Sequence, residues 1–384
     1  MSERNEKHKI IEPKYGRLLD DFQVGDLYHH PWEVTIDEGM LAMFAASFLD
    51  PNPLYSSRRF AQELGFKDRV VHPLVILNLS LSFTVHDISE QAIAHLAYID
   101  LKFPTPSYSG DTLSVYSEIL GLRVSESKRD RGVVHLRTTG INQDGVVVVT
   151  FERKALIPTG KLEGRAHRDA ARATSERTEP VGDASSSEAG GKHRLKSMLQ
   201  DTLPAELTAE IKTPAWPGRP RGLFEDFEIG DVILHSTGHT VGESEHMQLT
   251  ILTRNSHPLH FDEVYCRERS FTKTRVVEGG LVFAWTASLA SRDTTANALW
   301  EIGYDKGSHP NPVLGGNTLY AASRVLEKRD RDRQTGIVRF KLIGVKDEKP
   351  AALLAAGLDL FDGKFEQKVF EIERTILLPK LTLE

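Results

Sequence analysis

The order of apolar and polar positions along the chain predicts the same series of elements twice. In each half, a short helical pattern at residues 38–48 or 243–252 precedes a polar, proline-containing turn and an apolar helix at 74–84 or 281–291. Segments rich in Val, Ile, Leu and Tyr follow these helices and are typical of strands. The clearest strand patterns cover residues 112–120 and 146–156. One apolar helix with several antiparallel strands predicts a sheet curled around that helix, an α+β arrangement.

Five sequence matches in the same order indicate that the two halves are a duplication. They are DFQVGD at 21–26 with DFEIGD at 226–231, NPLY at 52–55 with HPLH at 257–260, RVVHP at 69–73 with RVVEG at 275–279, GDTL at 110–113 with GNTL at 316–319, and the Glu-Arg pairs at 152–153 and 373–374, each followed by a proline. A duplicated domain is therefore the firmest inference from the residues alone.

We expect an N-terminal repeat at residues 14–160 and a C-terminal repeat at 216–384. Residues 161–215 between them are rich in Arg, Glu, Ser, Gly and Ala, with too few large apolar residues to bury a core, so we expect a flexible linker. A short amphipathic helix at 195–203 is the one element that this stretch offers. Sheets with exposed edges need a partner, and the fused copies can supply it within the chain as a pseudo-dimer. Further homo-oligomerisation stays open.

Composition narrows the classes of function. The formal net charge of −6 argues against wholesale binding to nucleic acid. The polar start of the chain lacks the apolar core of a signal peptide, and the longest apolar stretch, at 73–83, is far shorter than the roughly 20 residues that cross a bilayer. We therefore expect a cytoplasmic protein without a membrane partner. The single cysteine, Cys266, excludes an intrachain disulfide and a cysteine-rich metal site, and we expect it to be buried.

The segment NSHPLH at 255–260, matched by DPNPLY at 50–55, resembles the D-x-N-P-(apolar)-H signature of MaoC-like hydratases. Together with GESEHM at 242–247, VEGG at 277–280 and HPNP at 309–312, it is most similar to the double hot-dog mesaconyl-CoA hydratases, also called β-methylmalyl-CoA dehydratases. The resemblance implies a tandem hot-dog fold, each antiparallel sheet being wrapped around a central helix. It also implies a hydro-lyase that adds water to a branched C5 dicarboxylic acyl-CoA. Such a reaction needs no metal, nicotinamide or flavin, and the substrate itself carries coenzyme A.

In this resemblance, His260 occupies the position of the family's histidine, which passes a proton to or from carbon or water. Asn255 occupies the position of the family's aspartate, and an amide can orient water but cannot accept a full proton. The missing carboxylate could be Asp50 from the other repeat, could be Asp262, or could be dispensable. We rank His260 first, Asn255 second and Asp50 third as catalytic residues.

Glycines at the start of the second apolar helix are candidates for binding the thioester oxygen, which becomes negatively charged during the reaction. Backbone N–H groups at a helix N-terminus stabilise such an oxygen, and Gly279 and Gly280 allow its close approach. The equivalent in the first repeat, Pro73, has no N–H to donate. We therefore expect the second repeat to be catalytic and the first to shape the pocket, with His72 in a capping or core role.

Three cations near the motif, Arg254, Lys273 and Arg275, are weak candidates for binding CoA phosphates or a substrate carboxylate, and could equally be surface charges. Three alternatives to the mesaconyl-CoA reaction remain at this point. The chain could hydrate another acyl-CoA, such as itaconyl-CoA or an (R)-3-hydroxyacyl-CoA; it could be a hot-dog thioesterase; or it could bind acyl-CoA without catalysis.

Overall fold

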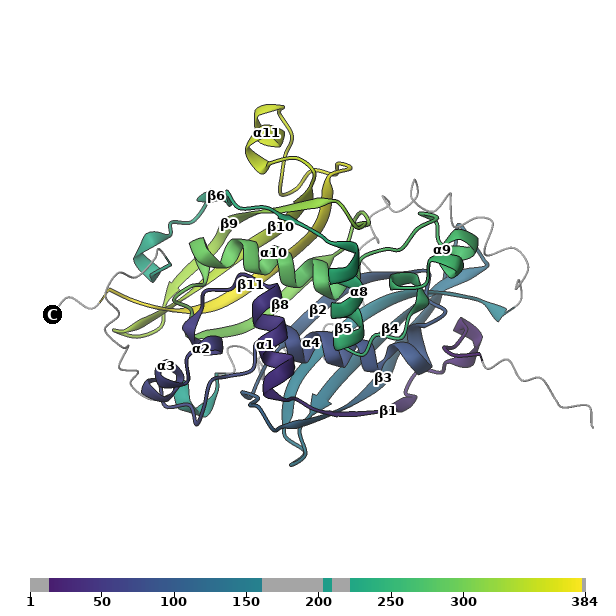
Figure 1. Cartoon of the computed structure of the whole chain (residues 1–384), viewed down its shortest axis with the longest axis horizontal. Helices are drawn as coiled ribbons and strands as arrows, with labels where there is room; N and C mark the ends of the chain where they lie inside the picture. Colours follow the sequence, from purple (N-terminus) through teal and green to yellow (C-terminus); the bar gives the residue numbers. More distant parts are fainter. Residues whose placement is uncertain (1–13, 161–202, 209–221, 382–384) are drawn as a thin grey trace, which may run out of the picture.

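The computed structural model describes residues 14–160, 203–208 and 222–381, and over these residues the chain forms two similar halves (Figure 1). The expected linker at 161–215 lies outside the described residues except for 203–208, which hold the short turn η5 (Ala205–Leu207). The expected helix at 195–203 lies outside them as well, apart from its last residue.

Both halves contain one long central helix, shorter helices before it and a set of antiparallel strands after it. The first half comprises η1 (Leu19–Asp21), β1 (Leu27–Thr35), α1 (Glu38–Ser47), α2 (Pro53–Ser56), α3 (Arg58–Glu63), α4 (Pro73–Phe83), η2 (Val85–Ser89), β2 (Ala94–Lys102), β3 (Thr112–Val124), β4 (Arg131–Ile141) and β5 (Val147–Pro158). The second half comprises η6 (Phe224–Asp226), β6 (Val232–Leu234), β7 (His239–Thr240), α8 (Glu243–Leu252), η7 (Pro258–His260), α9 (Glu263–Arg269), α10 (Gly279–Thr294), β8 (Trp300–Ser308), β9 (Thr318–Asp330), β10 (Thr335–Lys346), α11 (Pro350–Ala355) and β11 (Lys368–Pro379).

The strands form one continuous sheet in the order β1-β3-β4-β5-β2-β8-β11-β10-β9-β6, with β7 added beside β9. The two halves of this order are the two repeats, and they join where β2 pairs antiparallel with β8, for example Leu101 with Tyr304. Pairing these two strands removes one edge from each sheet, as a dimer of hot-dog domains would. The predicted α+β double hot-dog fold is confirmed.

The central helices α4 and α10 lie on the same side of the sheet and meet between the repeats (Figure 1). Nearly all residues of both helices are buried, as in helices enclosed by protein. At their contact, a Cβ on Gly280 would lie 2.0 Å from Oδ1 of Asn78, so only glycine allows this approach. The helices before them reach into the opposite repeat, and the indole of Trp285 donates to the carbonyl of Ser47 at 3.3 Å.

The predicted helices and strands are present, with ends that differ by a few residues. The largest difference is α10, which begins two residues before the predicted start at 281 and continues to Thr294. The insertion that contains α11 lies between β10 and β11 and packs Leu353, Leu360 and Phe361 against the outer face of the sheet. This insertion explains why the last of the five sequence matches is spaced more widely than the others.

Each half also repeats a partly buried chain of hydrogen bonds with the residue types of a hydrolase triad. Its members are His30, Asp87 and Ser117 in the first half and His235, Asp293 and Ser323 in the second, with distances of 2.8 to 2.9 Å. Both serines are almost fully buried on a strand, so no substrate can reach them. We interpret these chains as structural links: the first joins β1, β3 and η2, and the second joins the residue after β6 to β9 and to the last turn of α10.

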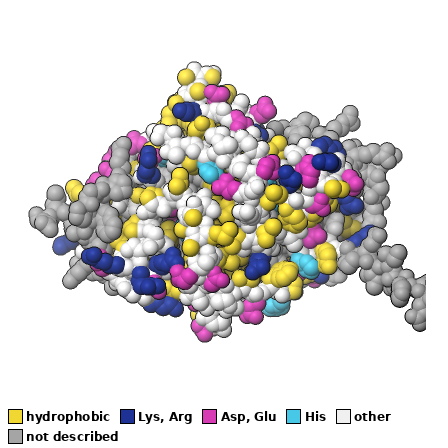
Figure 2. Space-filling model, viewed as in Figure 1, with side chains coloured by type: hydrophobic (Ala, Val, Ile, Leu, Met, Phe, Trp, Pro, Cys, Tyr) yellow, Lys and Arg dark blue, Asp and Glu magenta, His cyan; other side chains and the backbone are white. Residues whose placement is uncertain are grey.

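On the face shown in Figure 2, acidic and basic side chains are interspersed, with hydrophobic side chains across the middle over α1 and α8. Exposed hydrophobic residues of these helices and their ends include Met43, Leu49 and Ile251. None of the helices in the described part of the chain has the length and hydropathy of a membrane span.

Candidate active site between the two repeats

A pocket of about 190 Å³ lies between the repeats and takes its walls from both of them. The first repeat contributes α4, η2, β2 and β5, and the second contributes η7, the start of α10 and the loop after β8. Its polar or glycine lining residues are Ser89, His95, Tyr98, Arg153, Asn255, His257, His260, Glu278, Gly279, Gly280, His309 and Asn311. Four of the predicted site residues, Asn255, His260, Gly279 and Gly280, therefore come together in one cavity.

His260 ends the short turn η7, which Pro258 starts at its first position. The Nδ1 of His260 lies 2.7 Å from the carbonyl oxygen of Val276. Because a carbonyl can only accept, Nδ1 carries the hydrogen and Nε2 keeps its lone pair. Burial lowers the pKa of His260 to about 4, against the raising effect of this backbone hydrogen bond. At neutral pH the ring is therefore uncharged, with an acceptor nitrogen for a water molecule.

Asn255 is buried and uses both ends of its amide within the protein. Its Oδ1 accepts from the backbone N–H of His257 at 2.9 Å, and its Nδ2 donates to Oε1 of Glu278 at 2.9 Å. The backbone donor fixes the orientation of the amide, so the NH₂ group must face Glu278. The side chain thus holds the carboxylate of Glu278 in place, and the predicted orientation of a water by Asn255, which lines the same pocket, stays a prediction.

Glu278 is the carboxylate that the sequence analysis did not assign. It is 4% exposed, lies immediately before α10 and also accepts from the hydroxyl of Thr253 at 3.4 Å. Burial raises the pKa of Glu278 to about 7, against the lowering effect of the hydrogen bonds from Asn255 and Thr253. A carboxyl group with such a pKa exchanges protons readily near neutrality.

Comparison of the repeats contained the signal for Glu278. In the first repeat, Asp50 and His72 stand where the second has Asn255 and Glu278. His72 Nε2 lies 3.2 Å from Oδ2 of Asp50, so each repeat places one carboxylate in this pair, at opposite positions. The carboxylate that is missing at Asn255 is thus supplied by Glu278, the other member of the same pair.

Asp50 and Asp262, the two alternatives considered for the missing carboxylate, do not line the pocket. Burial alone would raise the pKa of Asp50, but the hydrogen bond and charge of His72 bring it below its ordinary value. Asp262 caps α9 by accepting from the backbone N–H of Tyr265 at 2.9 Å. The structure therefore does not bring the third-ranked candidate, Asp50, to His260.

The N-termini of the two central helices differ as their sequences predict. In the first repeat, His72 caps α4 through Nδ1, which accepts from the N–H of Leu74 at 3.1 Å, and Pro73 follows. The predicted capping role of His72 is confirmed. In the second repeat, Glu278 turns toward Asn255 and gives α10 no side-chain cap. The first N–H groups of a helix have no acceptor within the helix, so those of Gly279 and Gly280, which line the pocket, are available to an anionic oxygen.

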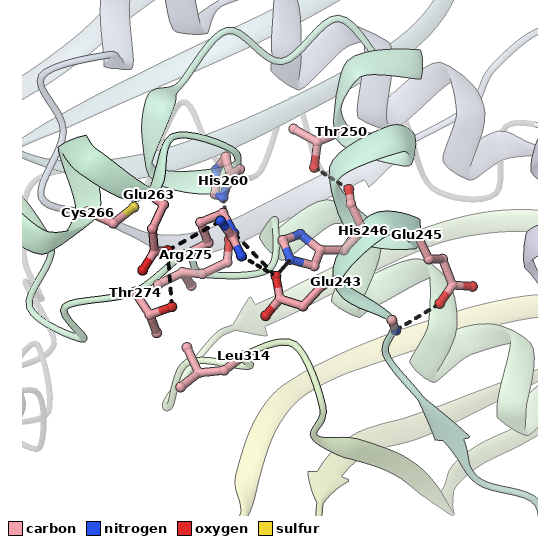
Figure 3. Close-up of polar contacts among 12 residues, drawn as sticks. Glu243, Glu245, His246, Thr250, His260, Glu263, Cys266, Thr274, Arg275 and Leu314 are labelled. Carbon is pink, nitrogen blue, oxygen red and sulfur yellow. Dashed lines mark hydrogen bonds and ion pairs between the residues drawn. The ribbon is translucent and has the colours of Figure 1, made fainter.

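Arg275 lies beside His260 and is held by two carboxylates (Figure 3). It pairs with Glu243 at 2.9 Å and with Glu263 at 3.3 Å, and Glu243 also contacts His246 at 3.3 Å. These partners neutralise the charge of Arg275, which was a candidate for binding CoA phosphates or a substrate carboxylate.

The other two candidate cations, Arg254 and Lys273, are exposed and do not line the pocket. Both have a positive φ, of 65° and 58°, which is typical of turns.

Cys266 is buried as expected, and burial raises the pKa of its thiol to about 11.

The wall from the first repeat contains a cation that the sequence analysis did not single out. Arg153 on β5 is 4% exposed, and its Nη2 donates to Oγ1 of Thr84 at 2.7 Å. Burial lowers the pKa of Arg153 to about 10, so the side chain is charged at neutral pH. Tyr98 pairs with Arg153 across the sheet, and His95 lies beside Tyr98 with ring centroids 4.4 Å apart.

The equivalent region of the other repeat is filled by the protein itself. Glu301 and Arg374, 2% and 3% exposed, form a buried ion pair in which Nε lies 3.0 Å from both carboxylate oxygens. The ring of Tyr304 lies under the guanidinium, and Tyr55 replaces the histidine of the motif. One of the two pseudo-equivalent sites is thus closed by side chains, whereas the other is an open pocket.

Known families match both halves of the chain. A family model described as mesaconyl-CoA hydratase matches residues 6–193, and a model described as a MaoC-like domain matches residues 226–346. The β-methylmalyl-CoA dehydratase of Chloroflexus aurantiacus is 32% identical over 334 residues, covering 86% of this chain and 89% of the relative. The mesaconyl-CoA hydratase of Cereibacter sphaeroides is 30% identical over 332 residues, covering 86% and 90%.

Solved structures with the same fold cover nearly the whole chain. A MaoC domain protein of Chloroflexus aurantiacus has a TM-score of 0.74 at 27% identity, covering 96% of this chain and 98% of that protein. A Mycobacterium tuberculosis protein described as a double hotdog fold has a TM-score of 0.67 at 19% identity, covering 94% and 98%. The second likeness supports the fold alone.

Proposed function

The chain belongs to the mesaconyl-CoA hydratase family, and we propose that its hydro-lyase reaction takes place in the pocket between the repeats, with Glu278 and His260 as its catalytic residues. Its curated relatives are hydratases and dehydratases of CoA thioesters, and the chain is an enzyme of this class. The observation that carries the location is the meeting of Glu278, His260 and the N-terminus of α10 in one cavity.

In the proposed mechanism, the ionised carboxylate of Glu278 accepts a proton from water. The water oxygen forms a bond to the β-carbon of the enoyl thioester, the electrons of the double bond move toward the thioester oxygen, and the α-carbon then takes the proton from Glu278. Glu278, with a pKa of about 7, is about 10³-fold more basic than His260, with a pKa of about 4. We therefore assign proton transfer to Glu278 and the orientation of the water to Nε2 of His260.

The thioester oxygen becomes negative when water adds, and the N–H groups of Gly279 and Gly280 would stabilise it. Their orientation is set by the helix before the substrate binds, so no reorganisation is needed as the charge develops. Water and a proton are the only groups that move in this scheme. For that reason we expect no metal, nicotinamide or flavin cofactor.

Mesaconyl-CoA is the substrate that we propose first, because the relatives that match most of the chain are named for it or for its hydration product. The pocket, of about 190 Å³, is small, which favours a short acyl chain over a long fatty chain. A thioesterase would direct water to the carbonyl carbon of the thioester. The relatives that match most of the chain are instead named as a hydratase and a dehydratase.

The proposed function is tested by incubating the purified protein with mesaconyl-CoA, itaconyl-CoA and crotonyl-CoA, with mass spectrometry of the products. We expect mesaconyl-CoA to gain the mass of one water, and β-methylmalyl-CoA to lose it. Release of free CoA without this gain would assign the protein to the thioesterases. Binding of the esters without any mass change would show a non-catalytic acyl-CoA-binding protein.

The pH dependence follows from the ionisation of Glu278. We expect kcat/KM for hydration to be constant above about pH 7 and to fall about tenfold per pH unit below it, because only the ionised carboxylate accepts the proton. The measurement is initial rates at low substrate concentration over a range of buffers. A profile that stays level down to pH 5 would mean that Glu278 is not the base.

Replacing His260 with alanine should lower kcat about 100-fold, because the water loses one of the two groups that orient it. His260→Gln is the matched variant, since its amide still offers an acceptor, and it should retain more activity than His260→Ala. Steady-state kinetics with mesaconyl-CoA measure both. Equal and near wild-type rates for the two variants would remove His260 from the mechanism.

A further inference from the structure

Arg153 is a buried cation with no carboxylate in direct contact within the described residues, although the negative charge of Asp87 acts on it. Its side chain lines the pocket, its Nη2 donates to Thr84, and its Nε has no hydrogen-bond partner. No ion pair of Arg153 is found in the described part of the chain. Keeping a guanidinium away from water without an anion is costly, so a ligand that supplies the anion would be bound strongly.

The second repeat contains an arginine at the equivalent position. In the first repeat, Arg153 pairs across the sheet with Tyr98, and in the second repeat Arg374 pairs in the same way with Tyr304. Two positions further along each arginine strand, Ala155 pairs with His95 and Ile376 pairs with Glu301. His95 and Glu301 therefore occupy the same place in the two repeats.

The two arginines differ in what stands at that place. Arg374 has the carboxylate of Glu301, with both oxygens 3.0 Å from its Nε. Arg153 has His95 instead, and the Nε2 of this imidazole is buried without a hydrogen-bond partner. Burial lowers the pKa of His95 well below its ordinary value, so the ring brings no charge of its own. The second repeat thus displays the group, a carboxylate, that this arginine position accommodates.

We propose that Arg153, with His95 beside it, binds a carboxylate on the acyl group of the substrate and so selects dicarboxylic acyl-CoA esters. This inference rests on the proposed function, because it concerns the same pocket. A guanidinium matches the two oxygens of a carboxylate with parallel N–H groups. Since Arg153 is only 4% exposed, at the wall of a small cavity, it suits a compact planar anion better than the bulky phosphates of CoA.

The test compares two substrates that differ at the carboxylate. Mesaconyl-CoA carries it, and tiglyl-CoA carries a methyl group in its place. We expect Arg153→Met to lower kcat/KM for mesaconyl-CoA on the order of 100-fold and to leave kcat/KM for tiglyl-CoA within about threefold of the wild-type value. An equal loss with both esters, or no loss with either, would overturn the proposal.

Arg137→Met is the matched control for the loss of one positive charge. Arg137 lies on the neighbouring strand β4, partly exposed and paired with Glu118 and Glu152, and it does not line the pocket. We expect this variant to keep the wild-type preference between the two esters. A change of preference as large as that of Arg153→Met would show a general effect of charge and would contradict a specific role of Arg153.

Thermal unfolding separates a ligand-binding role from a structural one. Arg153→Met removes a buried charge that forms no direct ion pair in the described residues, so its melting temperature should equal or exceed that of the wild type. Arg374→Met leaves Glu301 buried without its cation, and its melting temperature should fall. A clear decrease for Arg153→Met would mean that this arginine supports the fold, contrary to the proposal.

Equilibrium binding distinguishes a failure of this inference from a failure of the proposed function. If the wild-type protein hydrates neither ester, the proposed function is wrong, and titration calorimetry still tests Arg153. Mesaconyl-CoA should then bind more tightly than tiglyl-CoA to the wild type and equally to Arg153→Met. Hydration together with equal affinities for both esters in the wild type would leave the function standing and refute the role of Arg153.

Discussion

Glu278→Gln is expected to lower kcat/KM for hydration about 10³–10⁴-fold while leaving the protein folded. The glutamine has the same shape, and its Oε1 can still accept from Nδ2 of Asn255, but it cannot take a proton from water. General acid–base catalysis by one group contributes typically about 10²–10⁴-fold, and Glu278 here both removes and returns the proton. The residual rate should no longer fall below pH 7, since the group that caused this fall is absent.

The same variant should be more stable than the wild type at alkaline pH. The pKa of Glu278 in the folded protein, about 7, lies above the ordinary value of 4.5, so the folded state binds the proton more tightly than the unfolded state. The stability from this bound proton is complete below about pH 4.5 and is lost as the pH rises to 7. At about 1.4 kcal/mol per pKa unit, the loss amounts to about 3 kcal/mol.

Denaturant unfolding at pH 8 and at pH 4.5 measures this difference. Glu278→Gln should exceed the wild type by up to about 3 kcal/mol at pH 8 and differ little from it at pH 4.5. Asn255→Asp is an informative companion, because it sets a second carboxyl group beside Glu278 and should raise the pKa of the pair further. A Glu278→Gln variant that is inactive and also less stable at pH 8 would indicate a structural carboxylate.

Glu301→Gln is expected to reduce the free energy of unfolding by about 3–5 kcal/mol, because it leaves Arg374 buried without an anion. The ion pair lies in the closed site, away from the pocket, so the kinetics of the folded fraction should stay close to wild type. Denaturant titration at pH 7 measures the effect.

Replacing both partners shows whether the loss comes from the unpaired charge. The double variant Glu301→Leu, Arg374→Met should recover most of the stability, since two apolar side chains leave no uncompensated charge. A double variant that is as unstable as the sum of the two single variants would mean that the pair contributes nothing beyond its separate contacts.

The fold was predictable because it depends on patterns that survive in one sequence. The duplication, the two central helices and the strands follow from hydrophobic periodicity and from repeated short segments such as residues 21–26 and 226–231. The first turn of α10 was less predictable, because Gly279 and Gly280 are poor helix formers, and the place of Gly280 depends on its close contact with Asn78 of α4.

The site was predictable only in part. His260, Gly279 and Gly280 stood out because the motif and the glycine pair have chemical meanings within one segment. Glu278 could have been found by comparing the repeats at positions 72 and 278, but its raised pKa depends on burial, and Arg153 stands out only through its burial and its missing ion pair. Arg153 can be recognised only in the structure, where the carboxylate of Glu301 that pairs with Arg374 has no equivalent beside Arg153.

We propose that one of the two pseudo-equivalent sites, the open pocket at the start of α10, carries the reaction. The most direct test is kcat/KM for mesaconyl-CoA hydration by Glu278→Gln beside Asp50→Asn, the matched change at the carboxylate of the closed site. We predict a loss of about 10³-fold or more for Glu278→Gln and a value within about threefold of the wild type for Asp50→Asn. A large loss for Asp50→Asn with nearly full activity of Glu278→Gln would place the reaction in the other repeat and contradict the account.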